Sequence, residues 1–309
     1  MNLRVTSRIV LSGVLMLACE GSSSSAQAPE SDKPFPGKDL SENGWKFEQG
    51  LGTPINMVEA IRRYRKAADA GNPLAKARLA RIYFSGNGVE EDKAAGERLA
   101  KGVFPHVLKA AEKGDAVAAM TVGTMHADGL GVARDSAEGL KWLRKSADQN
   151  LAQAQTNLGV AYENGIGVRT DFTQAVKWYQ KAADQGHAMG QAALGDMYLK
   201  GRGVLRDPCE AVRLYTLSAA QNQAHAQTNL GYMYEHGCGV CRNSCEAARL
   251  YRLAADQGFA VAQANLGTMY ETGCGVPQDL SEAVNWYRRA AAQGEVHAIK
   301  ALHCLGCER

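Results

Sequence analysis

The sequence predicts an all-α fold, an α/α solenoid superhelix of about seven helix-turn-helix repeats of 36 residues. Three observations lead to this prediction: a recurring pattern of glycine and alanine, apolar residues spaced three and four apart, and cap residues at fixed places. The 309 residues exceed one average compact domain. A repeat array escapes that limit because each unit packs only on its neighbours.

The first half of each repeat carries the pattern A-x-x-x-L-G-x-x-Y-x-x-G-x-G-V, as from Ala154 to Val168. Its leucine position is occupied in turn by Leu79, Val122, Leu158, Leu194, Leu230, Leu266 and Leu302. These positions are 36 residues apart, except for a first interval of 43. Seven additional residues therefore lie between Val89 and Ala110, and a weaker copy of the pattern precedes them around Gly44.

The second half of each repeat is also periodic, as at Ala175, Tyr179 and Ala182. Apolar residues three and four apart share a helix face, so each half is expected to be an amphipathic helix. Three residues after each valine of the pattern stand Asp92, Asp135, Asp171, Asp207, Asn243 and Asp279. Side chains of this kind accept from free backbone N–H groups, so the second helix is predicted to begin there.

Glycine and asparagine mark the predicted end of each second helix. The positions are Gly71, Gly114, Asn150, Gly186, Asn222, Gly258 and Gly294, as a left-handed cap requires. Further glycines stand inside the first helices, at Gly159, Gly195, Gly231 and Gly267. A glycine there costs about 1 kcal/mol relative to alanine. We expect a close helix–helix approach to offset that cost.

With these motifs the chain resembles Sel1-like repeat proteins of the exported bacterial type over residues 40–309. The resemblance implies an α/α superhelix related to tetratricopeptide repeats and an adaptor function, often in bacterial envelopes. The chain departs from the pattern at three places. Its first copy is degenerate, His126 replaces the tyrosine, and the last copy stops after its first helix. Terminal units often deviate because they cap the stack.

The N-terminus is predicted to be a targeting segment. Two arginines precede an apolar run of ten residues, Ile9 to Ala18, which is too short to span a bilayer but suits a signal peptide. Two processing sites compete. A lipoprotein-type signal at 1–18 would leave Cys19 lipidated, with a flexible tether at 19–39, whereas an ordinary signal would cover 1–28. Both predict a protein exported to the periplasm, the first as a membrane-anchored lipoprotein.

The cysteines suggest two equivalent disulfides, since an exported protein can keep such bonds. Cys209 and Cys245 hold the same place in consecutive repeats, as do Cys238 and Cys274. Each pair, Cys209 with Cys238 and Cys245 with Cys274, is separated by 29 residues. Helicobacter cysteine-rich proteins use disulfides across similar repeats, although their cysteine positions differ from these.

The remaining cysteines are Cys241, Cys304 and Cys307, whose pairing the sequence leaves open. Two C-x-x-C pairs imitate a zinc site, but a solenoid would hold them about 20 Å apart. We therefore predict no metal and no cofactor.

No catalytic signature is present. The sequence has no S-x-x-K, K-T-G, G-x-S-x-G or H-E-x-x-H motif and no Walker loop. Without residues 1–18 the chain has 33 basic and 32 acidic residues, which gives no support for nucleic-acid binding. The sequence therefore predicts a protein that is not an enzyme and that meets a membrane only through an N-terminal lipid anchor.

Binding is expected on a concave groove lined by the first helices, by analogy with tetratricopeptide repeats. The exposed positions would lie two before, two after and five after each repeat leucine. The selected partner-binding residues are Tyr232, Glu235, Thr228, Asp196, Glu163, Thr268 and Glu271. Tyr232 is the preferred anchor because aromatic residues dominate binding hot spots. Asn157, Asn229 and Asn265 recur with the motif and are assigned a structural role.

The sequence thus predicts a non-catalytic scaffold or adaptor in the bacterial envelope that binds other proteins or peptides on this groove. Two alternatives stay open. One is a cell-wall-binding protein or β-lactamase-like hydrolase, and the other is a periplasmic signalling regulator.

Overall fold

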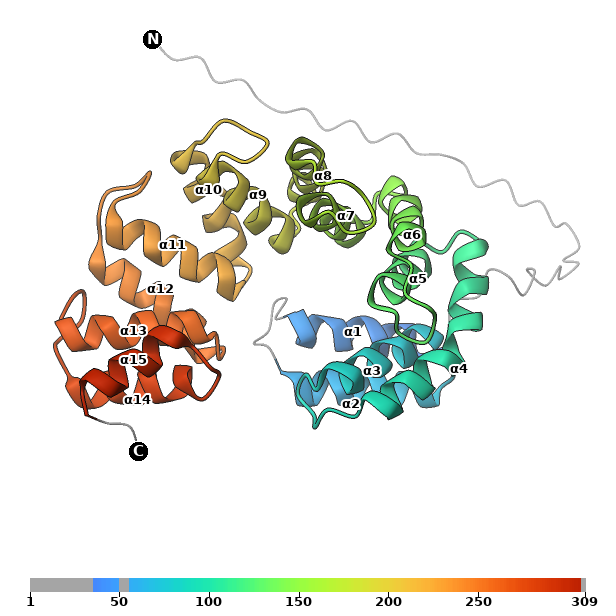
Figure 1. Cartoon of the computed structure of the whole chain (residues 1–309), viewed down its shortest axis with the longest axis horizontal. Coiled ribbons are helices and arrows are strands. Elements are labelled where there is room, and N and C mark those ends of the chain that lie inside the picture. Colours follow the sequence, from blue (N-terminus) through green and yellow to red (C-terminus); the bar gives the residue numbers. More distant parts are fainter. Residues whose placement is uncertain (1–35, 50–55, 307–309) are drawn as a thin grey trace, which may run out of the picture. The chain divides into compact units, whose positions relative to one another are not determined.

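The computed structural model describes residues 36–49 and 56–306, which are helical throughout apart from short connections (Figure 1). The predictions for signal peptide 1–18 or 1–28 and for lipidation of Cys19 lie outside the described residues, as does nearly all of the tether at 19–39. No strand occurs in the part of the chain that the structure describes. The predicted all-α fold class is confirmed.

Fifteen helices follow one another along the described chain. They are α1 (Lys38–Gln49), α2 (Met57–Asp69), α3 (Pro73–Ser85), α4 (Lys93–Glu112), α5 (Ala116–Asp128), α6 (Ser136–Asp148), α7 (Ala152–Asn164), α8 (Phe172–Asp184), α9 (Ala188–Lys200), α10 (Pro208–Ala220), α11 (Ala224–His236), α12 (Ser244–Asp256), α13 (Ala260–Thr272), α14 (Leu280–Ala291) and α15 (Val296–Cys304). Each helix packs on the next, most extensively within the pairs α1–α2 to α13–α14.

Seven helix pairs and one closing helix make up the predicted solenoid. Most helices have 13 residues, but α4 has 20. The seven additional residues of the sequence therefore lengthen the second helix of one repeat rather than form a loop. Pro105 lies within α4. Its ring leaves one carbonyl of the preceding turn without an N–H donor.

The predicted cap residues hold the helix ends. All six predicted N-cap side chains, from Asp92 to Asp279, accept a hydrogen bond from a backbone N–H two or three residues on. All seven predicted end residues have positive φ, including the two asparagines, Asn150 and Asn222, both at 65°. These are the only described non-glycine residues with positive φ. The local sequence therefore sets the repeat boundaries.

The glycines inside the first helices meet buried tyrosines of the second helices. A Cβ atom added to Gly159 would lie 2.5 Å from the ring of Tyr179, and one added to Gly231 would lie 2.8 Å from the ring of Tyr251. The tyrosines in this position are fully buried: Tyr64, Tyr179, Tyr215, Tyr251 and Tyr287. The expected close approach is confirmed, and a tyrosine ring fills the space that each glycine leaves.

A ladder of glutamine pairs runs along the repeats at 152–295, and each pair joins the two helices of one repeat, a contact that the sequence did not reveal. The side-chain amide of Gln185 donates to Oε1 of buried Gln155 at 2.7 Å. The same contact recurs at Gln221 with Gln191, Gln257 with Gln227 and Gln293 with Gln263, at 2.7 to 2.9 Å. A buried amide oxygen needs such a partner, so the ladder satisfies polar groups that the packing of the two helices removes from water.

None of the described helices combines the length and the apolar character that crossing a membrane would require.

Candidate partner-binding site

The first helices of successive repeats present polar side chains on one surface, which we call the first-helix face. Contacts link these helices in order. Arg81 of α3 pairs with Asp128 of α5 at 3.4 Å, and Asn229 of α11 donates to Asp196 of α9 at 3.0 Å. One pocket is lined jointly by α3, α5 and α7. The prediction that the first helices share a surface agrees with these contacts.

The face is rotated relative to the positions selected from the sequence. Residues two before the repeat leucine are buried, with Thr156, Ala192, Thr228 and Ala264 at most 4% exposed. The selection of Thr228 as a partner-binding residue is therefore wrong, because its hydroxyl is enclosed and donates to the Ala224 carbonyl. The pocket lining shows that positions five before, one before, two after and six after the leucine face outward. Because an α-helix turns by 100° per residue, these outward-facing positions lie about 60° around the helix axis from the positions selected from the sequence.

The selected glutamates hold tyrosines of their own repeats. The hydroxyls of Tyr179, Tyr251 and Tyr287 donate to Glu163, Glu235 and Glu271 at 2.6 to 2.7 Å. Burial, followed by the neighbouring carboxylate, raises the pKa of each tyrosine well above its ordinary value, so each stays a protonated donor. These three half-buried glutamates therefore fasten the second helix to the first.

Asp196 takes over this role in one repeat. Leu199 stands where α7, α11 and α13 have glutamate, and the Tyr215 hydroxyl donates to Asp196 instead. His225 lies on the next first helix, α11, and its ring nitrogen Nε2 is 3.2 Å from Oδ2 of Asp196. Burial alone would raise the pKa of Asp196, but the hydrogen bond and charge of His225 outweigh it and lower the pKa overall.

The Asp196–His225 contact is an acid–histidine pair that the sequence did not reveal, since the two residues are 29 positions apart. Its other partner is the amide of Asn229. Among the described contacts, no serine, threonine or cysteine side chain reaches His225. The pair therefore lacks the nucleophile that a hydrolytic triad would need.

Tyr232 is the selected residue with the largest exposed fraction. Its side chain is 48% exposed and its ring stacks on His236 with centroids 4.2 Å apart. Thr268, by contrast, is half-buried, and its hydroxyl contacts the Ala264 carbonyl and the Tyr287 hydroxyl. Of the selected residues, Tyr232 is thus the one whose side chain is both exposed and free of a role in the repeat packing.

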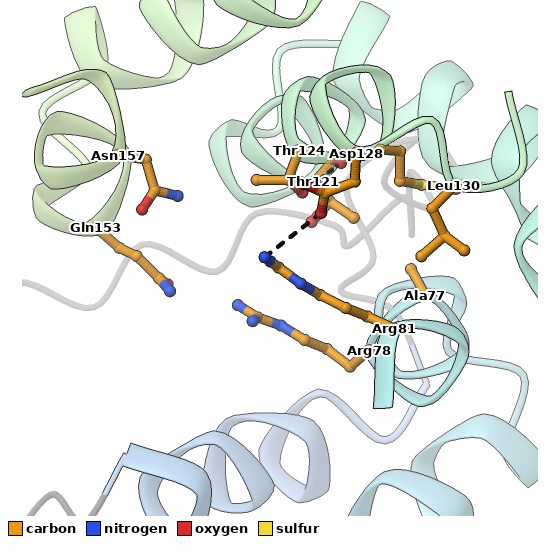
Figure 2. Close-up of a pocket in the computed structure, with 10 residues that line it drawn as sticks. Ala77, Arg78, Arg81, Thr121, Thr124, Asp128, Leu130, Gln153 and Asn157 are labelled. Atoms are coloured by element: carbon orange, nitrogen blue, oxygen red, sulfur yellow. Dashed lines mark hydrogen bonds and ion pairs between the residues drawn. The ribbon is translucent and has the colours of Figure 1, made fainter. Parts of the chain in front are cut away.

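Two arginines that the sequence analysis did not select lie on the same face. Arg78 and Arg81 of α3 line a pocket with Thr121, Thr124 and Asp128 of α5 and with Gln153 and Asn157 of α7 (Figure 2). The signal in the sequence is that α3 has arginine at the two face positions, one before and two after its leucine. The other repeats have asparagine, threonine or another uncharged or acidic residue there.

The repeated asparagines behave differently from one another. Asn229 bonds Asp196, in keeping with the structural role assigned to it. Asn157 lines the pocket, where its side chain makes no hydrogen bond to another described residue. Its assignment as a structural residue stays a prediction.

No disulfide joins the six described cysteines in the structure. A Cβ atom added to Gly239 would lie 2.9 Å from the backbone nitrogen of Cys209, so the loop with Cys238 abuts the start of α10. Gly275 meets Cys245 in the same way, at 3.0 Å. The predicted Cys209–Cys238 and Cys245–Cys274 bonds join segments that the fold places in contact, and they stay predictions. Cys307 lies outside the described residues.

No group of three or more histidine, cysteine, aspartate or glutamate side chains among the described residues could hold a metal ion.

A model of the Sel1 repeat matches seven segments of the chain: residues 44–72, 73–101, 116–151, 152–187, 188–223, 224–259 and 260–295. The chain belongs to the Sel1 repeat family. Proteins of this family generally serve as non-catalytic scaffolds that bind other proteins. No curated protein sequence matches the chain.

Solved structures place the chain among bacterial Sel1 proteins. It is 34% identical to c5321, described as a protective antigen of uropathogenic Escherichia coli strains with an SLR fold, with a TM-score of 0.58. That match covers 88% of this chain but 56% of the antigen, so the chain spans little more than half of that protein's length.

Two further structures share the fold. A Sel1 repeat protein of Oxalobacter formigenes is 29% identical over 74% of this chain and 86% of its own, with a TM-score of 0.62. An immunity protein of Pseudomonas aeruginosa, Pa5087, is 19% identical over 73% of this chain and 83% of its own, with a TM-score of 0.50. The last of these shows the fold alone.

Proposed function

We propose that this chain is a non-catalytic scaffold of the bacterial envelope that binds partner proteins on its first-helix face. It would be exported and held at the membrane by a lipid on Cys19. The leader-like residues 1–18, followed by cysteine, support that location.

Exposed Tyr232 is the observation that carries the proposal. Aromatic side chains supply much of the energy of protein interfaces, and they lose little conformational entropy on binding. Tyr232 stands on α11, between Asp196 of α9 and Thr268 of α13, which hold the same position in their own repeats. A partner lying along the face would meet the tyrosine and then the half-buried polar residues beside it.

The experiment is chemical cross-linking of the full-length protein in its native envelope, followed by mass spectrometry. Tyr232→Ala should lower the recovery of a specific partner at least tenfold. Leu217→Ala is the matched control, because Leu217 is similarly exposed, at 42%, but lies on the second helix α10. Glu235 is left intact because it holds Tyr251. Equal recovery from both variants would contradict the proposal.

A further inference from the structure

The pocket between α3, α5 and α7 holds two arginines, which no first helix from α5 to α13 carries. Helix α3 carries Lys76, Arg78 and Arg81 and no acidic residue. The first helices from α5 to α13 together carry a single lysine, Lys200, and no arginine. Among the first helices from α3 to α13, positive charge is therefore concentrated on α3, and its two arginines line the pocket.

Neither arginine is engaged in a strong ion pair. Arg81 lies 3.4 Å from Asp128, and both side chains are about half exposed, so solvent screens the pair. Arg78 has no carboxylate within ion-pair distance among residues 36–48 and 56–306. Figure 2 shows both guanidinium groups extending from α3 into the space toward Gln153 and Asn157. The donors of Arg78 are thus available to a ligand.

The opposite wall of the pocket supplies amides without partners. The side chains of Gln153 and Asn157 make no hydrogen bond to another described residue. Two repeats further along the chain, the equivalent residue Asn229 donates a hydrogen bond to Asp196. On α5, however, Thr124 stands at the place of Asp196, and its hydroxyl already donates to the Thr121 carbonyl. Asn157 therefore has no acid at the position that binds Asn229, and its side chain makes no hydrogen bond to another described residue.

We propose that this pocket binds an acidic side chain of a partner peptide. The aspartate or glutamate carboxylate would lie between Arg78 and Arg81, and the adjacent peptide group would bond Gln153 and Asn157. The planar guanidinium matches a carboxylate with two parallel hydrogen bonds. A carboxamide offers one donor and one acceptor side by side, as a peptide group requires. This inference rests on the proposed function, because it assigns a chemistry to a partner on the same face.

The charge at the pocket rim favours a carboxylate over a phosphate. Asp128 lines the pocket together with the two arginines. These three side chains together carry a net charge of +1. A single carboxylate neutralises that charge, whereas a dianion leaves one negative charge without a partner. The negative charge of Asp128 competes with the ligand for Arg81, so its removal should strengthen binding.

The test uses fluorescence anisotropy with the full mature chain. The probe is a labelled, C-terminally amidated peptide of glutamate alternating with serine, and its glutamine counterpart is the neutral control. The glutamate peptide should bind at least tenfold more tightly than the glutamine peptide. Arg78→Gln with Arg81→Gln should weaken binding at least tenfold, whereas Asp128→Asn should strengthen it about threefold. Circular dichroism establishes that each variant is folded.

A matched double variant separates the pocket from bulk charge. Arg98→Gln with Arg288→Gln removes the same charge from exposed positions on the second helices α4 and α14, and should change affinity less than twofold. Equal weakening by both double variants would overturn the inference, as would equal binding of the two peptides. A phosphoserine peptide that binds over tenfold more tightly than the glutamate peptide would also overturn it. Partner capture through Tyr232 does not depend on these arginines, so either proposal can fail alone.

Discussion

The repeats at 152–295 and the two before them at 73–151 share one fold but use their polar side chains differently. In the later repeats a tyrosine of each second helix donates to an acid of the first, and a glutamine pair also joins the two helices of each repeat. In the earlier repeats Leu143 stands in the tyrosine position and α4 is longer by seven residues. Neither the tyrosine–acid bond nor the glutamine ladder occurs within 73–151.

The difference teaches which polar groups are committed to the fold. Where the repeat is regular, glutamate, tyrosine and glutamine satisfy one another inside the stack. Where the two regions meet, Arg78 of the irregular region and Gln153 and Asn157 of the first regular helix, α7, have no such partners and line a pocket. Repeated residues therefore hold the solenoid where their partners are repeated too, and at the junction with the irregular repeats even a repeated residue such as Asn157 is available for binding.

The largest expected effect concerns the cysteines of the regular region. In oxidising conditions Cys209 should bond Cys238, and Cys245 should bond Cys274. Each closes a loop of about 30 residues and should stabilise the protein by about 3–4 kcal/mol. Peptide mapping without reductant, with denaturation before and after reduction, checks this. Cys209 joined to any other cysteine would remove the pairing.

A second comparison places alanine at two helical glycines. Gly159→Ala should destabilise the protein by about 1–3 kcal/mol, because the new methyl group overlaps the ring of Tyr179. Gly102→Ala, in the irregular α4, meets no atom within 4 Å and should stabilise by up to about 1 kcal/mol. Thermal unfolding of both variants measures the difference. Shifts of the same sign would contradict the close packing described for the regular repeats.

Loss of one tyrosine–acid bond should have a smaller effect. Tyr251→Phe removes the donor to Glu235 and leaves the ring in place, so the free energy of unfolding should fall by about 1 kcal/mol. Tyr232→Phe changes an exposed ring whose hydroxyl has no partner among the described residues, and should leave stability unchanged. Urea denaturation compares the two. If Tyr251→Phe matched the wild type, the bond would not contribute to holding the repeat.

The smallest effect is expected from His187, the N-cap of α9, whose Nδ1 accepts from the Gly190 backbone N–H. Burial lowers the pKa of His187 below its ordinary value of about 6.5. The unfolded chain then binds the proton more readily than the folded protein does. The stabilisation given by neutral His187 is therefore present above pH 6.5 and is lost as the pH falls through the folded pKa. His187→Asn keeps a capping side chain without titrating. Denaturation at pH 7.5 and 5 should show a steeper loss for wild type, and parallel losses would contradict this.

Much of the fold could be predicted from the sequence because its signals are local. A cap residue such as Asp171 and a terminal glycine such as Gly186 fix helix boundaries through backbone conformation alone. The seven-residue insertion in α4 was also predicted, from the spacing of the repeat leucine positions. The site was harder to predict, because exposure depends on how each helix is rotated against its neighbours. That rotation buried Thr228 and brought Asn157 into the pocket.

The bond between Asp196 and His225 could not be seen in the sequence for a related reason. It joins two helices of different repeats, and it depends on Leu199 replacing a glutamate that would otherwise take the tyrosine hydroxyl. Single substitutions of this kind change partners across the stack without changing the repeat period.

The central claim is that partners bind the first-helix face, and site-specific photo-cross-linking in the native envelope tests it most directly. A photoreactive amino acid would replace Tyr232 on α11 in one experiment and Leu217 on α10 in another. We predict a discrete adduct from position 232 and none from position 217, since the two side chains have similar exposure but lie on first and second helices. The same adduct from both positions, or one from position 217 alone, would contradict the claim.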